Sequence, residues 1–322
     1  MRRVRTGGVS ILAGLVGVAL YRTISVGYRR EIQQARERVT TGSQIAWTSC
    51  GPIEYSVAGA GPPVLVVHGA GGGYDQGMEF GQVLVRSGFR VIAMSRFGYL
   101  RTPLPADASP AAQADAHACL LDALDVRSVS VIGASAGAPS SAQFALRHPN
   151  RIDKLVLAVP ALYAPRPGVL GSVRTPAGTQ FLFNTALKSD FLFWAAIRLA
   201  RRTLIRAILA TPPEVVERAS SGEQARVGET LRHILPVSLR RLGLVNDGAV
   251  TSKLPPYELE RIGAPTLVIS MADDLFGTFD VACYTAKCIP KARFIGYPSG
   301  GHLWVEHQES IEAEIVSFLR SK

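Results

Sequence analysis

The sequence contains little cysteine and no spacing typical of a metal site. Its four cysteines, Cys50, Cys119, Cys283 and Cys288, are scattered, without a CxxC pair or a Cys/His cluster. Zinc sites need closely grouped ligands, so we predict no metal site and no cofactor. The cysteines are interpreted as small buried hydrophobic residues, with a Cys283–Cys288 disulfide as the alternative if the protein is exported.

Charge is also sparse over most of the chain. Charged residues make up 19% of the sequence and hydrophobic residues 47%, which is typical of a folded globular protein. The net charge of +10 is concentrated, because residues 1–40 contribute +6 and residues 161–260 contribute +5. Nucleic-acid-binding proteins normally carry a basic face on their folded core, so we expect no nucleic-acid partner here.

Long uncharged apolar runs are absent except near the amino terminus. Residues 7–21 carry no charge, but fifteen residues span only about 22 Å as a helix, less than the ~30 Å hydrocarbon core. Extension to residue 28 gives enough length and includes Arg22, whose side chain can reach the interface. We therefore predict a single-pass signal anchor over residues 7–28 and membrane localisation. A cleaved signal peptide, giving a secreted or periplasmic protein, is the alternative, although no A-x-A site follows.

Short strand-like runs alternate with helix-compatible stretches over the rest of the chain. Continuous apolar strands of this kind predict a mostly parallel sheet covered by helices on both faces, that is, an α/β fold. Two of the expected helices cover residues 111–124 and 310–320. The expected strands are Ile53–Val57, Val64–Val67, Val91–Met94, Val129–Ile132, Leu155–Val159, Thr266–Ser270 and Arg293–Tyr297. Functional groups of such sheets gather at the carboxyl ends of the strands.

One such strand end carries the sequence Gly133-Ala-Ser135-Ala-Gly137. A serine between two glycines at a strand-to-helix junction is the G-x-S-x-G nucleophile elbow, whose tight turn lifts the hydroxyl above the sheet. Chance also produces this pattern in a chain with 31 glycines. Its significance therefore depends on whether a base, an acid and an oxyanion donor occur at matching places.

A glycine-rich loop, His68-Gly-Ala-Gly-Gly-Gly73, directly follows the expected strand Val64–Val67. With the elbow, this loop makes the chain resemble the α/β-hydrolase superfamily over residues 43–322. The resemblance implies two oxyanion-hole N–H groups, those of Ala70 and Ala136, with Gly71 as the substitute for Ala70. The alternative, a phosphate-binding loop, lacks its G-K-[ST] sequence.

The resemblance also assigns an acid and a base. The acid falls at Asp274, just after the strand Thr266–Ser270, with Asp273 as the runner-up. The base is His302, which follows the last strand. The order Ser135, Asp274, His302 along the chain is the one expected for this fold. The other five histidines are assigned to the oxyanion loop, to helices or to the insertion: His68, His117, His148, His233 and His307.

This resemblance also predicts the domain organisation. Residues 1–40 form the anchor, residues 43–160 and 262–322 the core, and residues 161–261 a helical cap. The cap contains Phe181, Phe183, Phe191, Phe193 and Trp194, and an arginine stripe expected on one helical face: Arg198, Arg201, Arg202 and Arg206. The motif Ser95-Arg-Phe-Gly-Tyr is a further match, interpreted as structural with little bearing on chemistry.

The implied activity is hydrolysis of an ester bond of a small, apolar acyl substrate through an acyl-enzyme intermediate. Cleavage of carbon–carbon bonds or of amide and peptide bonds uses the same three residues and stays open. A non-catalytic binding protein with this fold is the remaining alternative.

Overall fold

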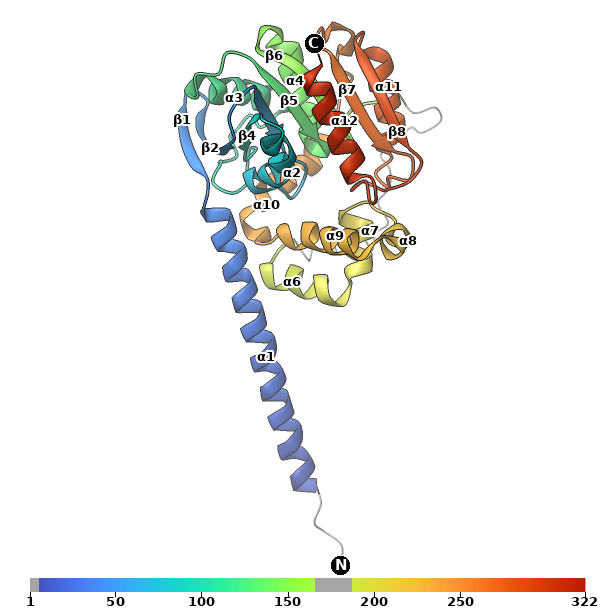
Figure 1. The fold of residues 1–322 in the computed structure, drawn as a ribbon. Helices are drawn as coiled ribbons and strands as arrows, with labels where there is room; N and C mark the ends of the chain where they lie inside the picture. Colours follow the sequence, from blue (N-terminus) through green and yellow to red (C-terminus); the bar gives the residue numbers. More distant parts are fainter. Residues whose placement is uncertain (1–5, 166–186, 322) are drawn as a thin grey trace, which may run out of the picture.

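An eight-stranded, mostly parallel sheet forms the centre of the protein. The computed structural model describes residues 6–165 and 187–321, with side chains from residue 21 onward (Figure 1). The strands are β1 (Gln44–Thr48), β2 (Gly51–Ala58), β3 (Pro63–Val67), β4 (Arg90–Met94), β5 (Val129–Ala134), β6 (Ile152–Ala158), β7 (Thr266–Met271) and β8 (Ala292–Tyr297). Their order is β1-β2-β4-β3-β5-β6-β7-β8, with β1 and β2 antiparallel to their neighbours and the other strands parallel. The expected α/β fold is confirmed, and β1 is the strand that the sequence did not indicate.

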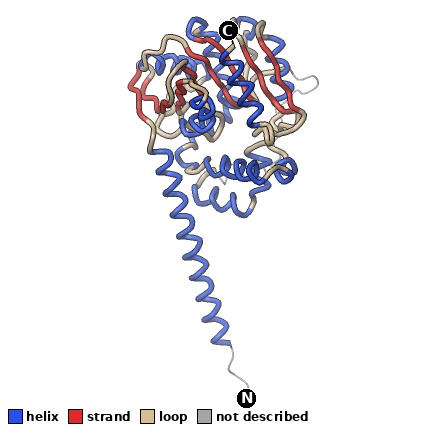
Figure 2. The backbone as a smooth tube through the Cα atoms, in the orientation of Figure 1, coloured by secondary structure: helices blue, strands red, loops and turns tan. Residues whose placement is uncertain are grey.

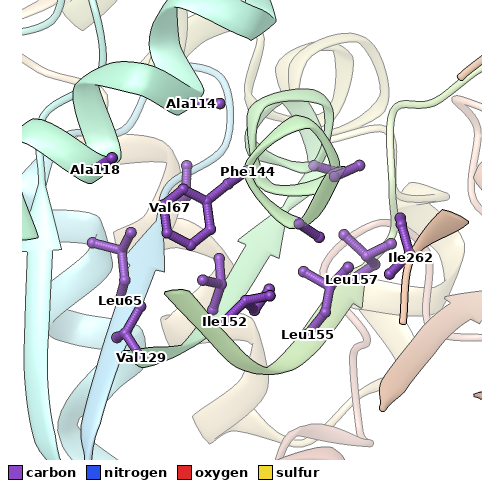
Figure 3. Packing of buried hydrophobic residues seen from close by; sticks show 14 of the residues in the cluster. Leu65, Val67, Ala114, Ala118, Val129, Phe144, Ile152, Leu155, Leu157 and Ile262 are labelled. Carbon is purple, nitrogen blue, oxygen red and sulfur yellow. The ribbon is translucent and has the colours of Figure 1, made fainter. Parts of the chain in front are cut away.

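Helices cover both faces of this sheet because successive strand residues point to opposite sides. One face of the sheet packs against α3 (Pro110–Ala123), α4 (Ala138–Arg147) and α11 (Thr278–Cys288). The opposite face packs against α2 (Tyr74–Arg86) and α12 (Gln308–Arg320). Figure 3 shows the first face, where Phe144 of α4 lies over side chains of β3, β5 and β6. In β3, Leu65 and Val67 belong to this cluster whereas Val64 and Val66 belong to the other.

A helical insertion separates β6 from β7 and has a hydrophobic cluster of its own. Its described helices are α6 (Asp190–Leu199), α7 (Arg201–Ile208), α8 (Pro213–Arg218), α9 (Ser221–His233) and α10 (Arg241–Thr251). In Figure 2 the strands, drawn red, lie above a separate layer of helices, drawn blue, which Figure 1 labels α6, α7, α8 and α9. Phe193 and Trp194 are buried within this layer, whereas Phe181 and Phe183 lie outside the described residues.

The predicted arginine stripe does not lie on one helix. A break at Ala200 separates α6 from α7, which places Arg198 on one helix and the other three arginines on the next. Arg198 stacks on Trp194, with 3.8 Å between its guanidinium carbon and the ring centroid, and pairs with Glu31. Arg202 pairs with Glu214 and Glu217. Arg198 and Arg202 therefore take part in ion pairs with carboxylates of neighbouring helices.

The prediction of a membrane anchor over residues 7–28, and with it membrane localisation, is wrong. Among the helices of the described residues, none combines the length and apolar content needed to cross a membrane. The amino-terminal segment is one helix, α1 (Thr6–Thr40), that runs straight into the charged sequence from Arg29 onward. The side chains of residues 7–20 lie outside the described part.

The carboxyl-terminal half of α1 packs against the insertion instead. Ile32 and Ala35, three residues apart on one helical face, belong to the insertion's hydrophobic cluster. Tyr28 makes edge-to-face contacts with Phe191 and Trp194 of α6. The other half of α1 extends away from the body of the molecule (Figure 1).

One disulfide joins the turn between β1 and β2 to α3. It links Cys50 to Cys119, whose Cα atoms lie 6.0 Å apart. Cys283 and Cys288 are free, so the alternative pairing considered from the sequence is wrong, and so is the interpretation of Cys50 and Cys119 as unpaired buried residues.

Candidate active site

Ser135 lies at the turn between β5 and α4, at the carboxyl edge of the sheet. Its φ of 50° places it in the left-handed region, which is unusual for a residue with a side chain. The flanking glycines are required by close packing: a Cβ at Gly137 would lie 2.5 Å from the carbonyl oxygen of Val67, and one at Gly133 would lie 2.4 Å from Ser141 Oγ. The local sequence therefore produces the sharp turn that was expected of an elbow.

Two further side chains converge on this serine. His302 Nε2 lies 2.9 Å from Ser135 Oγ, and His302 Nδ1 lies 2.7 Å from Asp274 Oδ2. Because a carboxylate only accepts, Nδ1 carries the proton and Nε2 is free to accept the serine hydroxyl proton. Phe276 packs edge-on against the imidazole, 5.0 Å between ring centroids. The sequence-predicted residues 135, 274 and 302 are thus brought together from three strand ends.

Asp274 is almost fully buried and well supplied with donors. Thr278 donates a short hydrogen bond to its Oδ2, and the backbone N–H of Phe276 donates to Oδ1 over 2.9 Å. Ser270 Oγ lies 2.9 Å from Thr278 Oγ1, so the two hydroxyl groups form a chain that leads to the carboxylate of Asp274. Sequence reasoning missed Thr278, although a threonine four residues after the acid, at the start of a helix, was the available signal.

Asp273, the runner-up for the acid, faces a different group. Its two carboxylate oxygens accept hydrogen bonds from the backbone N–H groups of Gly300 (3.2 Å) and Gly301 (2.7 Å). Both glycines have positive φ, 131° and 62°, so the loop that precedes His302 has a conformation that glycine adopts most easily. Asp274 therefore contacts the imidazole of His302, whereas Asp273 binds the backbone of the loop that precedes it.

The remaining histidines are engaged elsewhere. His117 is buried beside Met94 and Ser140, and burial lowers its pKa to about 3. His148 contacts Asp115 and His233 contacts Glu79, while His307 stacks on Tyr297. Within the described part of the chain, His302 is the histidine that contacts Ser135.

His68 occupies the start of the glycine-rich loop. Its Nε2 accepts the backbone N–H of Arg96 over 2.9 Å, so its proton resides on Nδ1, which donates to the carbonyl of Gly69 over 2.7 Å. Burial, and then the charge of Arg96, hold the pKa of His68 well below its usual value. This histidine is therefore a neutral structural group.

The predicted oxyanion donors lie at the junction of this loop and the elbow. A Cβ on Gly69 would lie 3.2 Å from Ser135 Cβ, so the loop passes directly against the serine. Gly71, the substitute donor, gives its N–H to the hydroxyl of Tyr99 over 3.2 Å. Within the described residues, the N–H groups of Ala70 and Ala136 donate to no protein acceptor.

Four buried polar residues beside the loop were not singled out as functional by sequence reasoning: Arg96, Tyr99, Arg240 and Asp247. The first two lie in the Ser95-Arg-Phe-Gly-Tyr motif, which gave a signal that was interpreted as structural. The other two lie in or next to α10, and nothing in their local sequence indicates a partner 150 residues away. In the described part of the chain, no group of three or more His, Cys, Asp or Glu side chains could hold a metal ion.

Known proteins are similar to this chain over most of its length. The family model described as the alpha/beta hydrolase fold matches residues 62–306. An uncharacterized hydrolase of Bacillus subtilis, YcgS, is 42% identical over 287 residues, covering 84% of this chain and 96% of its own length. A 2-hydroxy-6-oxononadienedioate/2-hydroxy-6-oxononatrienedioate hydrolase of Paraburkholderia xenovorans is 28% identical, covering 83% and 90% respectively.

A solved structure agrees with these sequence matches. The alpha/beta hydrolase fold protein from Nakamurella multipartita superposes with a TM-score of 0.62 at 30% identity, covering 86% of this chain and 99% of that one. The sheet order, the serine turn at the end of β5 and these similarities lead to one conclusion. The chain is a hydrolase that belongs to the α/β hydrolase fold family.

Proposed function

We propose that the protein is a serine hydrolase that cleaves ester bonds through an acyl-enzyme intermediate. One observation carries this proposal: His302 lies within hydrogen-bonding distance of both Ser135 Oγ (2.9 Å) and Asp274 Oδ2 (2.7 Å). Ser135 is then the nucleophile, His302 the general base and Asp274 the group that orients the imidazole.

The steps follow from these contacts. His302 takes the proton of Ser135 as the serine oxygen attacks the acyl carbon, and the ion pair with Asp274 stabilises the imidazolium. The N–H groups of Ala70 and Ala136 donate hydrogen bonds to the negatively charged oxygen of the tetrahedral intermediate. His302 then returns the proton to the leaving alcohol, and a water molecule activated by the same imidazole releases the acid from Ser135.

An apolar acyl group is the substrate that the surroundings favour. Phe276, which packs on His302, is 49% exposed, and its neighbour Leu275 is 41% exposed. Ile234 of the insertion lies against Gly71 of the glycine-rich loop. Apolar side chains of the core and of the insertion thus lie against His302 and against the glycine-rich loop. Residues 161–261 are proposed as a cap over a core formed by residues 43–160 and 262–322.

Hydrolysis of a carbon–carbon bond is the second candidate. It is supported by the similarity to the dienedioate hydrolase of Paraburkholderia xenovorans, whose name describes 2-hydroxy-6-oxo substrates. Such a reaction uses the same serine, base and oxyanion donors on a ketone instead of an ester. Amide cleavage has no comparable support.

A substrate panel separates these candidates. We expect p-nitrophenyl esters of increasing acyl length to be hydrolysed, and a fluorophosphonate probe to label Ser135. Ser135→Ala should abolish both, whereas Ser128→Ala, at a partly exposed serine that binds Asp153 outside the site, should change neither. Faster turnover of a 2-hydroxy-6-oxo-dienoate than of any ester would favour the second candidate. No serine-dependent turnover and no labelling would contradict both and favour a binding protein.

A further inference from the structure

The peptide group between Gly69 and Ala70 is fixed from its carbonyl side. The carbonyl oxygen of Gly69 lies 2.7 Å from His68 Nδ1, 3.2 Å from Arg96 Nη2 and 3.3 Å from the backbone nitrogen of Gly72. A trans peptide is planar, with its N–H opposite its C=O. Three donors on the oxygen therefore aim the Ala70 N–H toward the other side of the plane.

The neighbouring N–H groups of the loop are occupied. Gly69 gives its N–H to Gln76 Oε1 over 3.0 Å, and Gly71 gives its own to the Tyr99 hydroxyl. Tyr99 is fully buried, and burial, followed by the charge of Asp247, raises its pKa well above the usual value. Its hydroxyl therefore stays protonated and donates to Asp247 Oδ2 over 2.6 Å.

Arg96 is held by the same carboxylate. Its Nη1 and Nη2 each lie 2.7 Å from one oxygen of Asp247, and its Nε donates to the carbonyl of His68 over 2.9 Å. Both side chains are buried, with 7% and 8% of their surface exposed. A planar guanidinium bound at both ends cannot turn without breaking the paired hydrogen bonds.

Asp247 lies on α10, in the insertion, 151 residues beyond Arg96. The insertion therefore contributes the acceptor that positions a loop of the core. We propose that Asp247 is a positioning residue that orients the Ala70 N–H toward the oxyanion through Arg96 and Tyr99. This inference rests on the proposed function and deepens it.

Removal of the Asp247 charge should raise the free energy of the transition state. An asparagine keeps the size of the side chain but gives the two ends of Arg96 only one acceptor oxygen. The Gly69–Ala70 peptide then gains freedom to rotate, which weakens a hydrogen bond that matters most when the oxygen becomes negative. Substrate binding, which precedes that charge, should change little.

The test compares Asp247→Asn with Asp190→Asn on the full-length protein. Asp190 is a matched control because it is also a buried aspartate of the insertion, but its carboxylate accepts from Ser238 and pairs with Arg36 instead of with Arg96 or Tyr99. With a p-nitrophenyl ester, we expect Asp247→Asn to lower kcat about ten- to a hundredfold with KM changed less than about twofold. Asp190→Asn should leave kcat near the wild-type value, and Asp247→Glu should recover part of the loss.

Two spectroscopic signatures separate positioning from a general loss of packing. The carbonyl stretch of the acyl-enzyme should move to higher frequency in Asp247→Asn, because its oxygen has lost a donor, and should stay unchanged in Asp190→Asn. The amide resonance of Ala70 should shift in the first variant and not in the second. If Asp247→Asn does not fold, Tyr99→Phe, which removes only the hydroxyl, should show the same signatures to a smaller extent.

The outcomes distinguish the two proposals. Turnover that depends on Ser135, together with equal kcat and equal Ala70 shifts in the two aspartate variants, overturns the positioning role and leaves the hydrolase function standing. A shifted Ala70 resonance in Asp247→Asn, with no serine-dependent turnover in the wild type, supports the positioning and contradicts the catalytic function.

Discussion

The two loops that flank Ser135 are held in different ways. In the loop that carries His302, two aspartates of the core make the contacts next to the imidazole: Asp273 binds the N–H groups of Gly300 and Gly301, and Asp274 binds His302 itself. The glycine-rich loop, which follows β3, is held largely by buried side chains from other segments of the chain. Arg96 holds one part of this loop, and Arg240, next to α10, donates to the carbonyl of Gly72.

This difference separates local from long-range support. The two aspartates that bind Gly300, Gly301 and His302 lie 27 or 28 residues from them, at the adjacent strand end. The next residue, Leu303, also binds Thr211 and Arg226 of the insertion, 92 and 77 residues away. The supports of the glycine-rich loop that lie beyond the core, Asp247 and Arg240, lie 151 residues from Arg96 and 168 from Gly72. The hydrogen bonds of the proposed acid–base pair are therefore made within the core, whereas those that position the proposed oxyanion donor of the glycine-rich loop include buried charges of the insertion.

The largest expected effect is on the histidine side. In Asp274→Asn, an amide can offer its N–H to Nδ1 and favour the tautomer that protonates Nε2, so kcat for ester hydrolysis should fall by roughly 10³-fold or more. In Asp273→Asn, one amide oxygen still accepts from the glycine loop, so kcat should fall by less than about tenfold. Steady-state kinetics on both variants, with circular dichroism to establish folding, measure the difference. A larger loss in Asp273→Asn would reverse the assignment of the acid.

The next effect is on stability and concerns the glycine-rich loop. Asp75 binds both terminal nitrogens of Arg240, whose side chain is 0% exposed. Burial raises the pKa of Asp75, but the charge and hydrogen bond of Arg240, the charge of Arg38 and the backbone N–H of Gln76 together lower it below its usual value, so the pair is charged. Asp75→Asn leaves a buried arginine without its counter-charge. The free energy of unfolding, measured by urea titration, should therefore fall by about 3 kcal/mol.

An exposed pair provides the control for this measurement. Asp115 pairs with Arg147, and their side chains are 37% and 43% exposed. Asp115→Asn should therefore cost less than about 1 kcal/mol in the same urea titration, because solvent screens the charges. Equal losses in the two variants would show that the buried pair contributes no special support to the loop.

Acid should weaken the fold gradually through buried neutral histidines. His117 has a pKa of about 3 in the fold because of burial, against an ordinary value of 6.5, so below pH 6.5 the unfolded chain binds a proton that the folded chain does not. The contribution of His117 to the free energy of unfolding is therefore complete above pH 6.5. It falls by roughly 1.4 kcal/mol for each pH unit as the pH drops toward 3. His68, whose pKa is also lowered, adds to the slope.

The variant His117→Gln isolates this contribution. The free energy of unfolding, measured by urea titration between pH 4.5 and 7, should lose roughly 1.4 kcal/mol per pH unit of slope relative to the wild type. An offset that is equal at every pH would mean only that packing had changed. An unchanged slope would contradict a neutral buried His117.

The sequence indicated the parts of the site whose signals are local. Ser135 with its glycines, Asp274 and His302 each directly follow a strand that could be identified from its apolar residues, and parallel strands end at one edge. The choice between Asp273 and Asp274 needed coordinates, because a one-residue difference decides which carboxylate meets the imidazole.

The rest depended on contacts between distant segments. Asp247 looks like an ordinary helix residue in sequence, and only packing of α10 against the core brings it to Arg96. The amino-terminal helix was misjudged for the same reason. Its uncharged run suggested a membrane anchor, whereas the spacing of Ile32 and Ala35 acquires meaning only once the insertion lies beside it.

The packing of α1 on the insertion has a consequence for biosynthesis. Ile32 and Ala35 leave the ribosome early, but their partners on α6 are made roughly 160 residues later; Glu31 and Trp194, for example, are 163 residues apart. Through most of translation the first helix presents an apolar stripe without its partner, a situation that chaperones recognise. In a protein expressed from residue 41, the apolar surface of the insertion that α1 covers would stay exposed after folding.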